Sequence, residues 1–238
     1  GIPTNMPEFT KDFPDVALVP IVSSARALKL ICKKWQRYNK IPDAVIVEGP
    51  LSGGHQGFKY EDCFKEEFQL ENIVPPVIEE AKNWGDIPVI AAGGIWDKKD
   101  IDRFLALGCA GVQMATRFIG TFECDADSKF KDVLLNAKKE DIVLMGSPVG
   151  LPARGVKTNL QFAIENKTAP KVQCISNCVA PCHRGHEAKI VGYCIADRLG
   201  AAYKGDVETG LFFSGSNGYR IDKIISVKEL MEKLTKGE

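Results

Sequence analysis

The sequence lacks both a long hydrophobic run and a net charge. No apolar stretch approaches the roughly 18–20 residues that span a bilayer, and 31 Lys and Arg residues balance 31 Asp and Glu residues. We therefore expect no membrane-spanning segment, and the charge balance implies no nucleic-acid or anionic-membrane partner. The length of 238 residues suits one barrel-sized α/β domain, or a domain with an appendage.

Cysteine is also too scarce for a disulfide-rich scaffold. Eight cysteines occur in the chain, and those at 32 and 109 lie in apolar contexts typical of reduced thiols in a cytosolic core. The chain opens with Gly1-Ile2-Pro3, without an initiator methionine and without the pattern of a signal peptide. The expected location is the cytoplasm.

Short β-branched runs alternate with helical patterns through the first 146 residues. The expected strands are 16–22, 44–47, 88–92, 110–114 and 142–145, and the expected helices are 25–38, 73–84, 98–107 and 128–138. Alternating units of this length predict a parallel sheet with helices outside it, as in a Rossmann-type sheet or a barrel. The fold class expected is therefore α/β.

The alternation breaks after Gly146. A Gly- and Pro-rich stretch and a cysteine-rich loop come first, and helices are expected at 193–203 and 227–234. We divide the chain into β/α units over 1–146 and a cap or substrate-side region over 147–238.

A glycine-rich loop around His55 is the first candidate site. The strand at 44–47 leads into it, and Gly53 and Gly54 let the backbone pass close to a flat ligand. His55 would then stand beyond the carboxyl end of a strand, where parallel α/β folds keep their chemistry. With an unperturbed pKa of about 6.5, a histidine there suits proton abstraction. The alternative is a surface loop whose histidine caps a neighbour.

Two further turns predict a phosphate site. Gly93 and Gly94 end a strand and precede a helix, a geometry that aims backbone N–H groups at an anion. The second turn follows the next strand and consists of Gln113, Met114, Ala115 and Thr116. The loops after two successive barrel strands often share one phosphate. The alternative is that the glycine pair only makes a tight turn.

Together the three motifs resemble the nitronate monooxygenase (2-nitropropane dioxygenase) family, which includes FMN-dependent enoyl-ACP reductases. The matching stretches are VEGPLSGGHQG, IPVIAAGGI and GCAGVQMATRF. The resemblance implies a TIM (β/α)8 barrel that holds one FMN, with a smaller substrate-side domain. It also implies roles for individual residues. His55 would be the general base, Gly53 would lie against the flavin and Glu48 near the flavin ring. The FMN phosphate would be held by Gly94 and residues 113–116, with Gly93 adjacent.

Two departures from the family pattern affect these expectations. Five parallel strands cannot close an eight-stranded barrel, and Gly1-Ile2-Pro3 resembles an interior family segment. The chain is thus expected to be the C-terminal part of a barrel whose N-terminal half is a partner. Glu48 stands where many nitronate monooxygenases have Gln, and Ala115 replaces the usual Gly. The Glu form resembles the enoyl-ACP reductase branch.

The resemblance leaves three functions open for a small-molecule substrate. The first is oxidation of alkyl nitronates with O₂. The second is transfer of hydride from NAD(P)H through FMN to an enoyl thioester or a quinone. The third is a non-catalytic FMN-binding fragment or subunit. A homo-oligomer is also left open.

Three features of residues 147–238 stay open. Cys174, Cys178, Cys182 and Cys194, with two nearby histidines, could bind zinc or an Fe–S cluster, or form a reduced or redox-active group. Residues 215–220 resemble a late family segment near the active site, although turn chemistry explains them equally well. A lone arginine such as Arg154 is more often solvated or ion-paired than substrate-binding.

Overall fold

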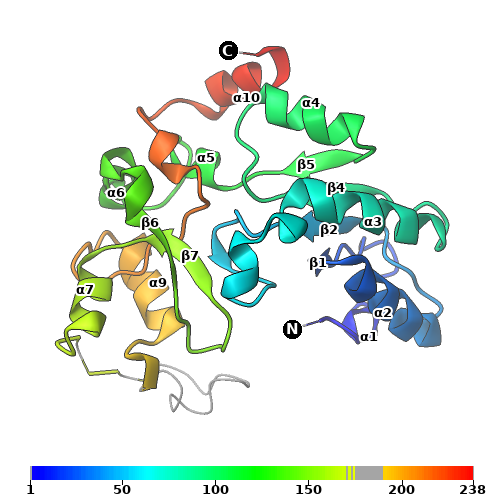
Figure 1. Ribbon diagram of the computed structural model, residues 1–238, viewed down its shortest axis with the longest axis horizontal. Helices are drawn as coiled ribbons and strands as arrows, with labels where there is room; N and C mark the ends of the chain where they lie inside the picture. The colour runs from blue at the N-terminus through cyan, green and yellow to red at the C-terminus, as the bar shows by residue number, and fades with distance from the viewer. Residues whose placement is uncertain (1, 170, 173, 175–189, 238) are drawn as a thin grey trace.

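The fold is centred on a four-stranded parallel sheet. The computed structural model describes residues 2–169, 171–172, 174 and 190–237 (Figure 1). Its strands run in the order β1-β2-β4-β5, with every neighbouring pair parallel. They are β1 (Ile21–Val22), β2 (Val45–Glu48), β4 (Val89–Ala92) and β5 (Gly111–Gln113). The predicted α/β class with a parallel sheet is confirmed. The first strand is shorter than expected, because Pro20 has no N–H for a ladder.

Three amphipathic helices follow these strands. They are α2 (Ala25–Trp35), α3 (Leu70–Lys82) and α4 (Lys98–Ala106). The side chains of Ser24 and Asp97 cap the first and third by accepting from the backbone N–H three residues on. One apolar core joins the helices to the strands, with Trp35, Val45, Val47 and Val77 fully buried. Residues 58–72 hold two short 3₁₀ turns, η2 (Glu61–Phe64) and η3 (Glu66–Phe68).

Helix α3 corrects an expectation about proline. Helix α3 begins at Leu70, one turn earlier than predicted, so Pro75 and Pro76 lie inside it and not in its first turn. Gln69 precedes the helix in an extended conformation, and the prolines lie in a helix with buried Val74 and Val77. Burial of this apolar face offsets the backbone hydrogen bonds that proline cannot make.

A second, antiparallel sheet stands beside the first. Its order is β3-β7-β6, with β3 (Gly54–His55), β6 (Ile142–Met145) and β7 (Ala153–Val156). The prediction of a fifth parallel strand at 142–145 is therefore wrong. An unbroken apolar run does not reveal strand direction, and the turn after Gly146 returns the chain antiparallel to it. The pairing of β6 with β7 joins residues on both sides of the predicted division between 146 and 147. The division itself stays a prediction.

The remaining helices are α1 (Met6–Phe9), α5 (Thr116–Ile119), α6 (Ser128–Asn136), α7 (Asn159–Glu165), α9 (Ile195–Tyr203) and α10 (Val227–Lys236), with 3₁₀ turns η1 (Gln36–Tyr38), η4 (Lys139–Asp141) and η6 (Gly218–Arg220). In Figure 1, α6, α7 and α9 lie around the second sheet, α10 lies beside α4, and α1 lies beside α2. Helix α10 packs on α4, since Leu230 and Leu234 are buried in a cluster that includes Ile101. The C-terminal segment thereby returns to the edge where β5 ends.

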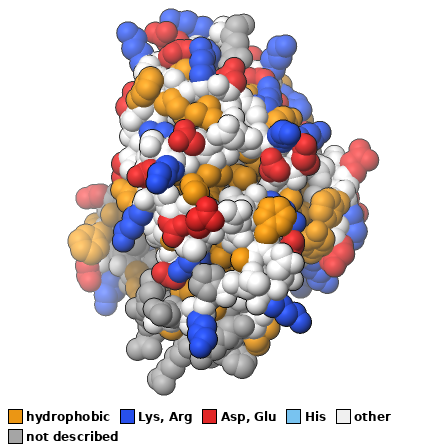
Figure 2. All heavy atoms as spheres, turned by 90° about the vertical axis from the view of Figure 1, so that its left-hand side faces the viewer, with side chains coloured by type: hydrophobic (Ala, Val, Ile, Leu, Met, Phe, Trp, Pro, Cys, Tyr) orange, Lys and Arg blue, Asp and Glu red, His pale blue; other side chains and the backbone are white. Residues whose placement is uncertain are grey.

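Lys and Arg side chains are interspersed with Asp and Glu on the face shown in Figure 2, in keeping with the zero net charge. Within the described residues, no helix is long and apolar enough to cross a membrane. The same residues hold no group of three or more His, Cys, Asp and Glu side chains that could bind a metal. Cys178 and Cys182 lie outside the described residues, so the cysteine-rich metal site stays a prediction.

Candidate active site at the carboxyl ends of the parallel strands

A cleft of about 240 Å³ opens where β2, β4 and β5 end. Its walls come from the loops that follow these strands and from residues 213–217, near the end of the chain. All eight residues predicted to bind the cofactor line it, namely Glu48, Gly53, Gly93, Gly94, Gln113, Met114, Ala115 and Thr116. Ala92, Ile95 and Leu51 add apolar surface. A cleft with apolar walls and a few polar groups is the usual form of a small-molecule site.

Close backbone approaches explain the glycines of this cleft. A Cβ at Gly53 would lie 2.7 Å from the backbone nitrogen of Gly215, and one at Gly93 would lie 2.9 Å from the Gly49 carbonyl oxygen. Gly93 also has φ +97°, in the left-handed region where glycine is favoured. The loops therefore pack backbone against backbone, and any larger residue at 53 or 93 would force them apart.

Gln56 braces the glycine-rich loop from inside. Its side chain is 1 % exposed, and its Nε2 donates to the carbonyl oxygens of Ser52 at 2.9 Å and Gly54 at 3.0 Å. These two bonds fix the curve of the backbone around Gly53. Gln56 was not among the predicted site residues, since a glutamine beside a histidine is not by itself a motif.

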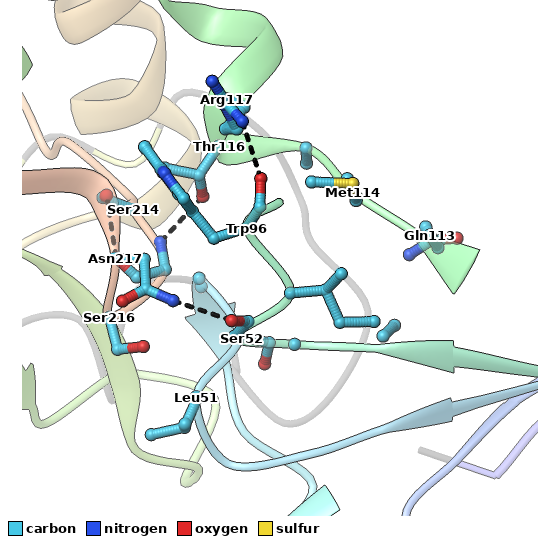
Figure 3. A pocket seen from close by; sticks show the side chains of 18 of the residues that line it. Leu51, Ser52, Trp96, Gln113, Met114, Thr116, Arg117, Ser214, Ser216 and Asn217 are labelled. Carbon is cyan, nitrogen blue, oxygen red and sulfur yellow. Dashed lines mark hydrogen bonds between the residues drawn. The ribbon is translucent and has the colours of Figure 1, made fainter. Parts of the chain in front are cut away.

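Residues 215–217 hold the walls of the cleft together through three hydrogen bonds, and Figure 3 shows the one that Asn217 donates. The Gly215 backbone N–H donates to Thr116 Oγ1 at 2.9 Å, and Asn217 Nδ2 donates to the Gly94 carbonyl oxygen at 2.7 Å. The backbone N–H of Ser216 donates to the Leu51 carbonyl oxygen at 3.0 Å. One segment thus contacts the loops after β2, β4 and β5, and brings the two predicted phosphate turns into the same wall.

Two arginine side chains lie against Trp96 and form a positively charged corner of the cleft, called here the cationic corner. The guanidinium carbons of Arg117 and Arg220 lie 4.8 Å and 4.9 Å from the centre of its ring, within cation–π range. Arg117 Nη1 also donates to the Trp96 carbonyl oxygen at 2.8 Å. Because Trp96 and Arg117 both line the cleft, this corner adds positive potential beside the turns at 93–94 and 113–116.

Glu48 brings a carboxyl group that holds its proton unusually well. It ends β2 and lines the cleft. Burial raises the pKa of Glu48 to about 7, and a hydrogen bond with Ser52 opposes that rise only in part. The carboxyl group can therefore donate or accept a hydrogen bond near neutral pH.

His55 lies beside the cleft, on the antiparallel sheet and not on the open loop that the sequence indicated. It pairs with Ala153 of β7, and its neighbours Gly53 and Gly54 line the cleft. Its ring meets Phe213 edge to face at 5.4 Å, and its Nε2 lies 2.7 Å from Ser147 Oγ. Burial lowers the pKa of His55, which favours the neutral imidazole that a general base requires.

Arg154 ties the two sheets together. It lies on β7, is 7 % exposed, and its Nη2 donates to the Pro50 carbonyl oxygen at 2.8 Å. Burial lowers the pKa of Arg154. The residue is buried in the fold instead of solvated, and it holds the glycine-rich loop against the second sheet.

The chain matches the family model described as nitronate monooxygenase over residues 1–237. A curated "Probable nitronate monooxygenase" of Staphylococcus aureus (strain Newman) is 34% identical over 119 residues, which cover 48% of this chain and 31% of that protein. The chain thus spans about a third of the length of this curated relative.

Solved structures are similar over nearly the whole chain. The structure of FabK from Thermotoga maritima superposes with a TM-score of 0.74 at 28% identity, covering 100% of this chain and 65% of that one. Nitroalkane oxidase from Streptomyces ansochromogenes superposes with a TM-score of 0.66 at 25% identity, covering 93% and 57%. With the match of the family model to almost every residue, these findings show that the chain belongs to the nitronate monooxygenase family.

Proposed function

We propose that this chain supplies the FMN-binding and catalytic residues of a flavin-dependent oxidoreductase that oxidises alkyl nitronates with O₂. The observation that carries the proposal is the convergence of the eight predicted cofactor residues on one cleft of a chain from this family. They come from three separate strand ends. A cleft at the carboxyl edge of a parallel sheet is also where α/β enzymes bind their cofactors.

The residues of the cleft fit FMN. Gly53 has no Cβ, so a flat ring could lie close to the backbone, with Glu48 near its polar edge. Gly93, Gly94 and residues 113–116 would hold the phosphate through backbone N–H groups and the Thr116 hydroxyl. The cationic corner of Arg117 and Trp96 stands beside them and complements a dianion. When bound, FMN supplies the electron transfer.

In this proposal, the chain's own catalytic contribution is a base. His55 would remove the α-proton of a neutral nitroalkane, or hold the nitronate by a hydrogen bond. The lowered pKa of His55 keeps its ring unprotonated at neutral pH. Phe213 packs against the ring and shields one of its edges from water.

A second function is favoured by Glu48 and by the likeness to FabK, which extends over the whole chain. It is transfer of hydride from NAD(P)H to an acceptor such as an enoyl thioester or a quinone. His55 would then bind or polarise that acceptor. A non-catalytic FMN-binding role is the third outcome. Cytoplasmic location, self-association and completion of the barrel by an N-terminal half stay predictions.

The test is anaerobic mixing of the purified FMN-loaded protein with propyl-2-nitronate and, separately, with NAD(P)H, while the flavin absorbance is followed. Rapid bleaching by the nitronate supports the proposal, and with 2-nitropropane the His55→Ala variant should bleach about 10²–10⁴-fold more slowly. Bleaching by NAD(P)H alone would move the protein to the reductase function. No bleaching by either would leave a flavin-binding scaffold.

A further inference from the structure

A second cleft, of about 650 Å³, is lined by residues from η2, β6, β7 and α7. None of the described residues that line it also lines the cleft at the strand ends. Arg154 of β7 forms part of its wall, and the space is called here the arginine cleft. It is therefore a separate candidate for binding a small molecule.

The guanidinium of Arg154 is buried without a balancing charge. The side chain is 7 % exposed, and within the described residues its one hydrogen bond runs from Nη2 to the Pro50 carbonyl oxygen. In the same part of the chain, its buried Nε has no hydrogen-bond partner and no carboxylate pairs with it. An arginine does not lose its proton in a protein, and a buried charge is costly unless it is paired. An anion bound in the cleft would offset that cost.

The other charged side chains of the arginine cleft balance each other. Lys157 and Glu165 both line it, and Lys157 Nζ lies 3.0 Å from each oxygen of the Glu165 carboxylate. This pair leaves the single positive charge of Arg154, which one carboxylate would balance. Apolar side chains complete much of the wall, namely Phe64, Ile142, Leu144, Ile164 and Val191. The cleft therefore suits a molecule with one negative charge and an apolar body.

Leu144 lies directly opposite Arg154 in the antiparallel sheet. The two residues are partners in the register of β6 and β7 (Figure 1), and both line the arginine cleft. Side chains of such partners leave the sheet on the same face, with Cβ atoms about 4.5–5.5 Å apart. The leucine offers the guanidinium no acceptor, so this side of Arg154 is open to an acceptor from a ligand.

We propose that the arginine cleft binds a small monocarboxylate with an apolar body, and that its carboxylate pairs with Arg154. The planar guanidinium presents its N–H donors in a fork that matches a carboxylate. The apolar walls remove the body of the ligand from water. This binding is measurable without turnover and does not depend on the reaction of the flavin.

Calorimetric titration of the FMN-loaded protein with hexanoate tests the proposal. The matched neutral probe is 1-hexanol, and inorganic phosphate is an anion without an apolar body. Hexanoate should bind about 10–100-fold more tightly than 1-hexanol, as expected for hydrogen bonds to a charged group, and more tightly than phosphate. Equal affinities for hexanoate and 1-hexanol, or no binding of hexanoate, would overturn the pairing with Arg154. Phosphate binding as tight as that of hexanoate would overturn the apolar body.

Two substitutions of Leu144 locate the bound carboxylate. Leu144→Glu supplies a carboxylate from the opposite strand and should abolish hexanoate binding, whereas the similarly sized Leu144→Gln should retain it. Leu144 does not line the cleft at the strand ends, so both variants should bind FMN as the wild type does, which also shows that they are folded. Hexanoate binding that survives Leu144→Glu would place the carboxylate elsewhere and refute the site.

Thermal unfolding without a ligand tests the unbalanced charge itself. Leu144→Glu should melt about 2–4 °C above Leu144→Gln, the usual shift for one favourable interaction in a chain of this size. The same two substitutions at exposed Leu105 of α4 are the control, and there the difference should be small. A melting temperature of Leu144→Glu equal to or below that of Leu144→Gln would show that Arg154 lacks no anion.

Discussion

Asn217 and Gly94 lie 123 positions apart, yet the Asn217 side chain donates to the Gly94 carbonyl oxygen at 2.7 Å. This bond fastens the C-terminal segment to the turn that follows β4. The turn forms one wall of the cleft, and the shape of that wall therefore depends on a residue near the end of the chain. Asn217 is only partly buried, so the contact serves to position the turn more than to add apolar burial.

Replacing Asn217 by Ala should weaken FMN binding and lower the free energy of unfolding by about 1 kcal/mol, the net value of one hydrogen bond. Flavin fluorescence titration and thermal unfolding measure the two effects. Asn159→Ala is the matched control, because its Nδ2 also donates at 2.7 Å, but to exposed Glu208 away from the cleft. Equal losses of FMN affinity in both variants would refute the role given to Asn217.

Glu48→Gln should change how stability depends on pH. The pKa of Glu48 is raised in the folded state from 4.5 to about 7, so the folded protein binds this proton more tightly than the unfolded chain. The resulting stabilisation is complete below about pH 4.5 and is lost as the pH rises through 7. Relative to Glu48→Gln, the wild type should therefore lose stability between these values.

Denaturant unfolding of both proteins at pH 5, 6, 7 and 8 measures this trend. The variant should be the more stable one at pH 8, with a difference that shrinks toward acid. Glu232→Gln removes a carboxylate from an exposed site on α10 and controls for net charge. If the difference in free energy of unfolding between wild type and Glu48→Gln stayed constant across this pH range, the raised pKa of Glu48 would be contradicted.

Gly93→Ala should destabilise the protein more than Gly85→Ala. Both glycines have positive φ, +97° and +89°, so each alanine should cost about 1–2 kcal/mol of backbone strain. A Cβ at 85 meets nothing within 4 Å, whereas one at 93 meets the Gly49 carbonyl oxygen at 2.9 Å. Gly93→Ala should therefore lose roughly 1–3 kcal/mol more stability than Gly85→Ala, the usual cost of overpacking. This difference measures the effect of the close approach at Gly93. Equal losses in the two variants would show that the loop yields freely.

Gln56→Glu should destabilise the glycine-rich loop severely at neutral pH. The buried amide donates to two carbonyl oxygens, and a carboxylate there would face both without a proton to share. The cost should exceed about 2 kcal/mol and shrink as the pH falls and the new carboxyl group is protonated.

Gln69→Glu is its counterpart at a more exposed site. The Gln69 amide also donates to two carbonyl oxygens, those of Cys63 and Lys65, but water can reach it. The loss there should be below about 1 kcal/mol, as measured by denaturant unfolding. If both variants lose equal stability, burial is not what makes Gln56 critical.

Local patterns were sufficient to predict the four strands of the parallel sheet and the helices α2, α3 and α4 that follow them. The alternation of Val45 and Val47 with less buried neighbours, and the capping residues Ser24 and Asp97, depend on contacts within a few residues of each other. The motif glycines also indicated the site, because Gly53 and Gly93 mark close backbone approaches. The eight predicted cofactor residues do meet in one cleft, although their roles stay predictions.

What could not be predicted depends on contacts between distant segments. The direction of β6 is set by its pairing with β7, and the strand character of His55 by Ala153. Neither pairing leaves a trace in local periodicity. The closure of the cleft by residues 214–217 was also open, since a Gly- and Ser-rich segment is equally typical of a surface turn.

The hydrogen bond from Arg154 to Pro50 has a consequence for how such enzymes diversify. His55 and Arg154 belong to neighbouring strands of the antiparallel sheet, while the turns at 93–94 and 113–116 belong to the parallel one. A change in the length of the turn between β6 and β7 would therefore move His55, and through Arg154 the glycine-rich loop, relative to the turns at 93–94 and 113–116. Under the proposed function, reaction preference and cofactor binding would then depend on different sheets of one polypeptide.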